Sequence, residues 1–139
     1  MQMVTPVNPQ ASVDDLRARM AHAQLYVLAI TRTAQYGGSG PDEATSLMRE
    51  HLIYLWQLEV AGKLFGAGPL ERSEDASGPV GMIVVAAGSR EEAESVATNE
   101  PFHRAGWRVN TVRGWTLNEG AAAFLGKLMS DLAATAKGD

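Results

Sequence analysis

Cysteine is absent from the sequence, and several chemistries are absent with it. Without thiols there is no disulfide framework, no thiolate nucleophile and no thiolate-bound zinc. Any reaction must therefore use histidine, carboxylate or hydroxyl side chains, or a borrowed cofactor, and no motif in the chain points to a cofactor. The missing cysteines also agree with a cytoplasmic location, which we expect for this protein.

Long hydrophobic runs are absent as well. The longest aliphatic and aromatic run is confined to residues 25–30, whereas a membrane-spanning helix needs about 20 apolar residues. The opening MQMVTPVNPQ has neither a basic start nor an apolar segment, so a secretory signal is not expected. We therefore expect a soluble, unexported protein that has no membrane partner.

Positive charge is scarce and dispersed. The 12 lysines and arginines are outnumbered by 16 aspartates and glutamates, which gives a net charge of -4. Because the basic residues occur singly, the chain lacks the positive surface that nucleic acids attract, and we expect no nucleic-acid partner. The glycine-rich stretch 36–41 lacks the Lys-Ser or Lys-Thr of a phosphate loop, so it is predicted to be a flexible connection or lid.

The 139 residues suit a single domain, which can bury roughly two thirds of the surface of its unfolded chain. Apolar and alternating segments predict four strands, and amphipathic segments predict two helices between them. The strands are placed at 24–32, 63–70, 80–87 and 107–117, and the helices at 41–61 and from Ser89 to a break at Pro101. This order, βαββαβ, predicts an α+β, ferredoxin-like fold with a four-stranded antiparallel sheet.

Two further helices flank this core. Residues 1–22 are predicted to form a mobile tail and a short helix capped by Ser12, and 23–117 the ferredoxin-like domain. Residues 118–139 are predicted to form a helix, opening at Asn118 or Glu119, that packs on the domain or on a dimer partner. Its apolar face carries the large side chains, and its opposite face the polar ones. The apolar set is Phe124, Leu125, Leu128, Met129, Leu132 and Ala133.

His51 is the residue that looks out of place in the long helix 41–61. It falls near the middle of an arc of mostly apolar positions, so an ionisable ring is aimed at the core. The members of that arc are Leu47, Met48, Leu52, Leu55, Leu58 and Gly62. On the far side, Ile53, Trp56 and Val60 form a second apolar stripe, for which the terminal helices are the expected cover.

A set of short motifs gives the chain a family resemblance over roughly Gln24 to Trp115. The motifs are His51, Leu58-Glu59, Ala61-Gly62-Lys63-Leu64, Ala67-Gly68-Pro69-Leu70, Glu92-Ala93-Glu94, Pro101-Phe102, Ala105-Gly106, Arg113 and Trp115. In combination they resemble the YCII-related family. The resemblance implies a dimeric α+β barrel, in which two sheets face each other, and hence a homodimer with pockets beside the sheets.

The same resemblance implies a catalytic dyad of a helix histidine and an aspartate before a Pro-Phe step. His51 matches the histidine and Glu100 replaces the aspartate, whereas Met48 stands where the family often has an arginine. A carboxylate bonded to one ring nitrogen fixes the tautomer and leaves the other nitrogen as a general base. The dyad predicts a lyase or hydrolase-like enzyme, and the resemblance implies aromatic intermediates as one substrate class. Gly68, Pro69 and Phe102 are the predicted ligand contacts.

Three alternatives to the dyad stay open. A buried His51 bonded to Glu100 also serves as plain scaffold between two helices. In that case the chain is a non-catalytic, ligand-binding or structural homodimer. The spacing of Glu100 and His103, with His51 as a third ligand, is that of a metal site, but Pro101 interrupts the helix and we expect no metal.

Overall fold

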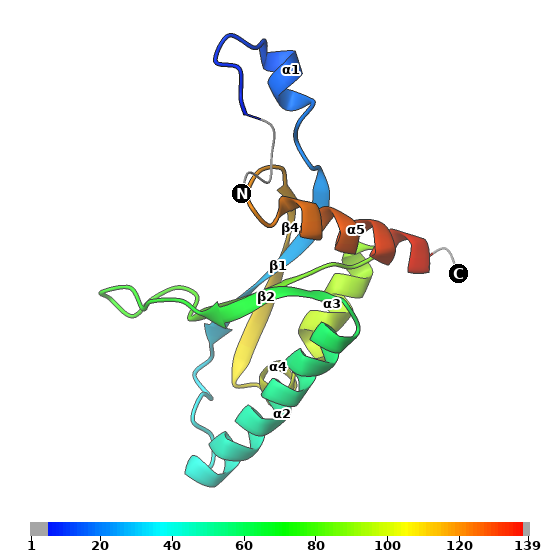
Figure 1. Cartoon of the computed structure of the whole chain (residues 1–139). Helices are drawn as coiled ribbons and strands as arrows, with labels where there is room; N and C mark the ends of the chain where they lie inside the picture. The colour runs from blue at the N-terminus through cyan, green and yellow to red at the C-terminus, as the bar shows by residue number, and fades with distance from the viewer. Residues whose placement is uncertain (1–5, 138–139) are drawn as a thin grey trace.

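One four-stranded antiparallel sheet organises the chain, with strand order β2-β3-β1-β4 (Figure 1). The computed structural model describes residues 6–137, so residues 1–5 of the predicted tail and the last two residues of the predicted C-terminal helix lie outside the described part. The strands are β1 (Ala23–Arg32), β2 (Leu64–Pro69), β3 (Gly81–Val85) and β4 (Arg108–Leu117). The predicted ferredoxin-like α+β fold is therefore confirmed.

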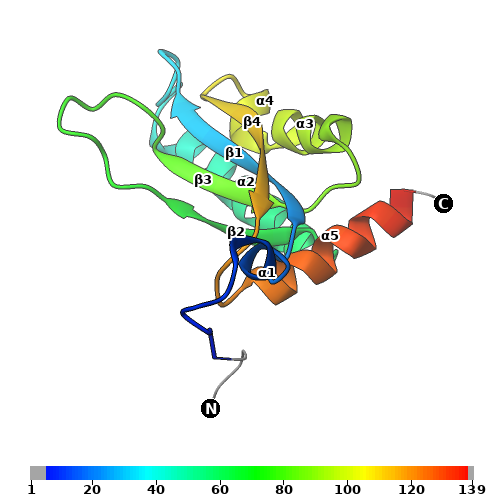
Figure 2. The same cartoon turned by 90° about the horizontal axis from the view of Figure 1, so that it is seen from above.

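Helices lie on both faces of this sheet. They are α1 (Val13–Arg17), α2 (Pro41–Val60), α3 (Arg90–Asn99), α4 (Pro101–Arg104) and α5 (Ala123–Lys137). Helices α2 and α3 cover one face, α5 lies against one end of the other, and α1 projects from the body (Figures 1 and 2). Within the described residues, no helix combines the length and the apolar character needed to cross a membrane.

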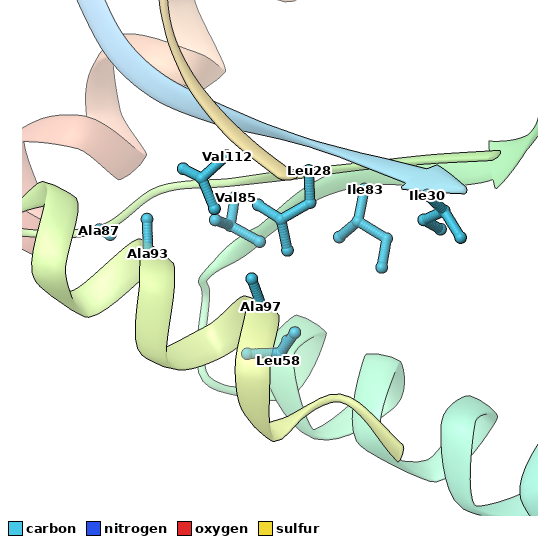
Figure 3. Packing of buried hydrophobic residues seen from close by; sticks show 9 residues of the cluster. All are labelled: Leu28, Ile30, Leu58, Ile83, Val85, Ala87, Ala93, Ala97 and Val112. Carbon is cyan, nitrogen blue, oxygen red and sulfur yellow. The ribbon is translucent and has the colours of Figure 1, made fainter. Parts of the chain in front are cut away.

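The main core lies between the sheet and helices α2 and α3 (Figure 3). Because side chains alternate along a strand, every second residue of β1 points to this side, including the buried Leu28 and Ile30. They meet Leu58 of α2 and Ala97 of α3. Each fully buried aliphatic side chain contributes about 1.5–3 kcal/mol, so this layer fixes where the two helices sit on the sheet.

Helix α5 approaches the opposite face with its small residues. At Gly126, a Cβ atom would lie 2.9 Å from a methyl carbon of Leu117 and 3.4 Å from Phe65 Cε2, so a larger residue would displace these side chains. Ser130 adds a hydrogen bond by accepting the backbone N–H of Gln24 at 3.1 Å. Met129 and Ala133 also pack on this side, whereas four large apolar side chains of α5 stay exposed: Phe124, Leu125, Leu128 and Leu132.

Within residues 6–137, neither terminal helix of this protomer covers the back of α2 as predicted. Trp56 is 69% exposed and Val60 is 89% exposed. Helix α5 instead follows the apolar end of the sheet, where it meets Leu25 and Val84. The prediction that Met48 and Leu52 face the core is wrong too, because both are exposed. His51 is buried, as predicted.

The ends of the elements follow local rules. Gly62 has a φ of +74°, the left-handed backbone that commonly ends a helix, and the register of β2 against β3 shifts between Leu64 and Gly66. Ser89 caps α3 by accepting the Glu92 N–H. After Pro101 the chain forms the short helix α4, and the last helix starts at Ala123 rather than at the predicted 118 or 119.

Candidate functional site

His51 and Glu100 meet between α2 and the start of α4. The imidazole Nδ1 lies 3.2 Å from Glu100 Oε2, and Glu100 has no exposed surface. His51 belongs to a buried row on α2 that includes Leu47 and Leu58, at the spacing that places residues on one helical face. The two residues that the sequence proposed as a pair are therefore in contact.

The helix break before Pro101 determines where the Glu100 carboxylate lies. A residue before proline is driven out of the α-helical region, and Glu100 has an extended ψ of 133°. Helix α3 ends at Asn99 for this reason, and Glu100 becomes the N-cap of α4. Its Oε2 accepts the Phe102 N–H at 2.6 Å, so the oxygen that caps α4 also faces His51.

Asn110 is the site residue that the sequence reasoning missed. Its Nδ2 donates to Glu100 Oε1 at 3.2 Å and to the Ala97 carbonyl at 3.0 Å, and the residue is 5% exposed. The signal was available, because Asn110 occupies an inward position of the alternating strand that also places Val112 in the core. A polar residue at such a position needs a buried partner.

The surroundings keep Glu100 ionised. Burial alone would raise the pKa of Glu100, but the hydrogen bonds from His51, the Phe102 N–H and Asn110 outweigh it and lower that pKa below its usual value of 4.5. Tyr54, one turn after His51, donates its hydroxyl to the Val96 carbonyl at 2.7 Å. Burial, assisted by the negative charge of Glu100, raises the pKa of Tyr54, so this phenol stays protonated at neutral pH.

The second nitrogen of His51, Nε2, has no hydrogen-bond partner among residues 6–137. No described residue hydrogen-bonds to it, and it is not among the fully buried polar atoms that lack a partner, so it keeps contact with solvent. An ionised Glu100 carboxylate can only accept a hydrogen bond, so Nδ1 carries the proton that faces it. In the neutral ring the lone pair therefore lies on Nε2. The arrangement is chemically able to take a proton at one defined atom and to return it.

The predicted ligand contacts are not brought together. Phe102 lies beside His51, with ring centroids 5.4 Å apart, but it is only 2% exposed and packs against Leu47 and Trp107. Gly68 and Pro69 lie on β2, at the opposite edge of the sheet from Asn110. A ligand touching His51 would therefore not touch the Gly68-Pro69 edge of the same chain.

A cavity of about 390 Å³ lies elsewhere in the protein. It is bordered by the end of α2, the start of β2 and α5, through residues that include Gly62, Lys63, Met129 and Ala133. Gly62 follows His51 by about three turns of helix, so this cavity is separate from the imidazole. Lys63 and Glu92 form an ion pair of 3.1 Å at its edge.

The two other histidines do not join the pair. His103 Nδ1 accepts the backbone N–H of Asn110 at 3.1 Å, so it ties α4 to β4. His22 is exposed before β1. Across the described part of the chain, no group of three or more histidine and carboxylate side chains is arranged to hold a metal ion.

A ferredoxin-like sheet with a buried histidine–carboxylate pair under its helices defines the class of protein, a small α+β domain. Within that class, the chain belongs to the YCII-related domain family, whose model matches residues 24–116. The match spans nearly the whole of β1 through β4 and leaves α1 and α5 outside. The family resemblance drawn from the sequence is thus confirmed.

For this chain, similarity to individual proteins is found among solved structures. No curated protein shows significant similarity to it. Among solved structures, it is similar to 5-chloro-2-hydroxyhydroquinone dehydrochlorinase from Burkholderia phenoliruptrix, determined in complex with 2,5-dihydroxybenzoquinone. The two share 21% identity and a TM-score of 0.48, and the similarity covers 67% of this chain and 93% of the other.

Proposed function

We propose that this protein is a small-molecule enzyme with proton-transfer chemistry of the lyase or hydrolase type. His51 is the general acid and base, and Glu100 orients its ring. The observation that carries the proposal is the 3.2 Å contact between His51 Nδ1 and Glu100 Oε2, with Nε2 left without a hydrogen-bond partner among the described residues. Proton transfer to a positioned imidazole contributes roughly 10²–10⁴-fold to a rate.

In the proposed reaction, Nε2 removes a proton from a phenol, an activated carbon or a water molecule. The imidazolium that forms is stabilised by the Glu100 carboxylate. It then gives the proton to the leaving group as the bond to that group breaks. The low pKa of Glu100 supports this role, because a carboxylate that stays ionised does not compete for the proton. Tyr54 and Asn110 hold the surrounding elements and touch no reacting atom.

The substrate class and the assembly belong to the same proposal. Aromatic intermediates are proposed from the family resemblance alone. A homodimer is proposed because the sheet face opposite α2 and α3 keeps apolar side chains exposed beyond the reach of α5, including Val109 and Trp115. A cytoplasmic location remains a prediction from the composition.

The test compares two matched histidine variants on a panel of hydroquinones and catechols with and without a halogen. In His51→Asn, the amide Nδ2 occupies the place of Nδ1 and still donates to Glu100, so the helices stay tied while the base is removed. The control is His22→Asn, an exposed position. We expect turnover to fall at least about 100-fold in the first variant and to be unchanged in the second.

A second candidate function is a non-catalytic binding or structural module. It is favoured by the burial of Phe102, which leaves little of this ring open to a ligand beside His51. A cavity away from His51, bordered by α5, is a candidate place for a ligand of such a module. Here the His51–Glu100 contact only joins α2 to α4. Equal turnover by the wild type and His51→Asn, with both proteins folded, would select this module over the enzyme.

A further inference from the structure

Two arginines stand side by side at the end of the sheet that carries the His51 site. Arg32 of β1 and Arg108 of β4 are directly paired in the sheet register, on the face that also carries Asn110. Like charges directly opposite each other on two strands are destabilising. Neither guanidinium has a carboxylate partner or a side-chain hydrogen bond within residues 6–137, so their charge is not compensated by the described chain.

Aromatic rings hold both guanidinium groups in place. Arg32 Cζ lies 4.2 Å from the Tyr36 ring centroid, and Arg108 Cζ lies 3.9 Å from the Phe102 centroid and 5.8 Å from that of Tyr36. Stacking of this kind uses the flat face of a guanidinium and leaves its in-plane N–H donors unused. The two guanidinium groups are therefore oriented by aromatic rings, and their N–H donors have no hydrogen-bond acceptor among residues 6–137.

The nitrogen atoms of the Arg108 guanidinium differ in burial. Its Nε is fully buried and has no partner, whereas its two terminal nitrogens also lack partners but are not fully buried. A buried donor without an acceptor is costly and rare in folded proteins. An oxyanion reaching this guanidinium from solvent would neutralise the charge and meet its exposed donors in a fork geometry.

The segment that carries Tyr36 is fixed against the site. The hydroxyl of Thr33 donates to the Gly106 carbonyl at 2.6 Å, and the Tyr36 and Trp107 rings meet edge to face at 5.6 Å. The loop therefore holds Tyr36 beside both arginines. Phe102 is shared, because its ring contacts Arg108 and also the imidazole of His51.

We propose that Arg32 and Arg108 form an anion site that orients a small carboxylate-bearing substrate against His51. The carboxylate meets the two guanidinium groups, and the rest of the molecule extends past Phe102 toward Nε2. A carboxylate fits because its two oxygens match the planar fork of an arginine. The proposal deepens the proposed function and rests on it for the reaction at His51, but not for the binding of the anion.

The test is a binding titration of the ¹⁵N-labelled full chain with sodium benzoate, followed at the Arg108 Nε–H and the Phe102 amide. Benzamide, which has the same shape without the charge, is the ligand control. We expect saturable shifts with benzoate and binding at least about tenfold weaker with benzamide, the loss of roughly one charge-assisted contact.

Three variants locate the anion. Arg108→Gln and the exposed Arg32→Gln are each expected to weaken benzoate binding about tenfold or more, measured at Phe102. Arg72→Gln, which removes the same charge from an exposed loop, is expected to bind as the wild type does. Thermal unfolding of each variant checks that it is folded. If Arg108→Gln does not fold, benzoate binding by Arg32→Gln tests the anion site.

Equal benzoate binding by the wild type and the folded arginine variants would overturn the anion site, as would the absence of any saturable shift. Because this titration needs no turnover, its result is independent of the catalytic comparison. Normal benzoate binding by His51→Asn together with unchanged turnover would remove the proposed reaction and leave the anion site standing.

Discussion

Asn110 of β4 donates to Glu100 at 3.2 Å and thereby holds from the sheet side the carboxylate that meets His51 from the helix side. Glu100 is the junction of three elements, because the same side chain also caps α4. The position of the imidazole thus depends on residues that touch no substrate.

Removing the Asn110 amide is expected to destabilise the fold. Asn110→Ala leaves the Ala97 carbonyl without this donor and Glu100 with fewer donors, so we expect a loss of about 1–3 kcal/mol in the free energy of unfolding. Urea denaturation measures it. The control is Thr111→Ala, the next residue on the exposed face, and an equal loss in both variants would contradict the role given to Asn110.

Glu100 is expected to make stability depend on acid pH. Folding lowers its pKa, so on acidification the unfolded chain binds this proton first. The stability that Glu100 contributes is therefore complete above the usual value of 4.5 and is lost as the pH falls through the lower, folded-state value. Urea denaturation between neutral and acid pH should show a smaller fall for Glu100→Gln than for the wild type. Glu74→Gln, in an exposed loop, should fall as the wild type does.

Gly38 is expected to tolerate no side chain. Its φ is +41°, and a Cβ would lie 2.7 Å from Trp107 Cε2 and 2.8 Å from Glu43 Oε2. Gly37 also has a positive φ, but a Cβ there would meet nothing within 4 Å. Gly38→Ala should therefore lower the melting temperature more than Gly37→Ala does. The added overlap corresponds to a difference of about 1–3 kcal/mol in the free energy of unfolding. Equal effects would show that only backbone strain matters.

The open sheet face is expected to be the dimer contact. Val109 is 42% exposed on the side of β4 that faces away from α2 and α3. Val109→Glu would place a charge in that contact, so we expect sedimentation velocity to report a dimer for the wild type and a monomer for the variant. Val13→Glu, on α1, is the control. Dissociation by Val60→Glu instead of Val109→Glu would place the contact on α2.

The turn between β2 and β3 offers a direct check of a shifted pKa. Hydrogen bonds from the Ser77 hydroxyl and backbone, followed by that from the Ser73 hydroxyl, lower the pKa of Asp75 to about 2. Removing the first donor with Ser77→Ala is expected to raise this pKa toward its usual value of 3.8. Carbon-detected NMR titration of the Asp75 carboxyl measures the change, and Ser46→Ala, on α2, should leave it unaltered.

The sequence predicted best where a local rule decides the outcome. The ends at Gly62 and Ser89 follow from left-handed backbone and from capping, and Pro101 had to end α3 and release Glu100 from the helix. It predicted less well where two surfaces compete. Helix α5 has several large apolar side chains, but it packs on the sheet through the side with Gly126, which allows a close approach.

Residue order by itself determined the βαββαβ core, because periodicity and the break at Pro101 are properties of the chain. Its short motifs indicated the family, and that resemblance implied the pairing of His51 with Glu100. Only the tertiary structure decided that Asn110 completes the pair and that Arg32 and Arg108 share Tyr36. The first depends on how β4 packs against α3 and α4. The second depends on strand register, which pairs Arg32 with Arg108 through backbone hydrogen bonds between distant segments.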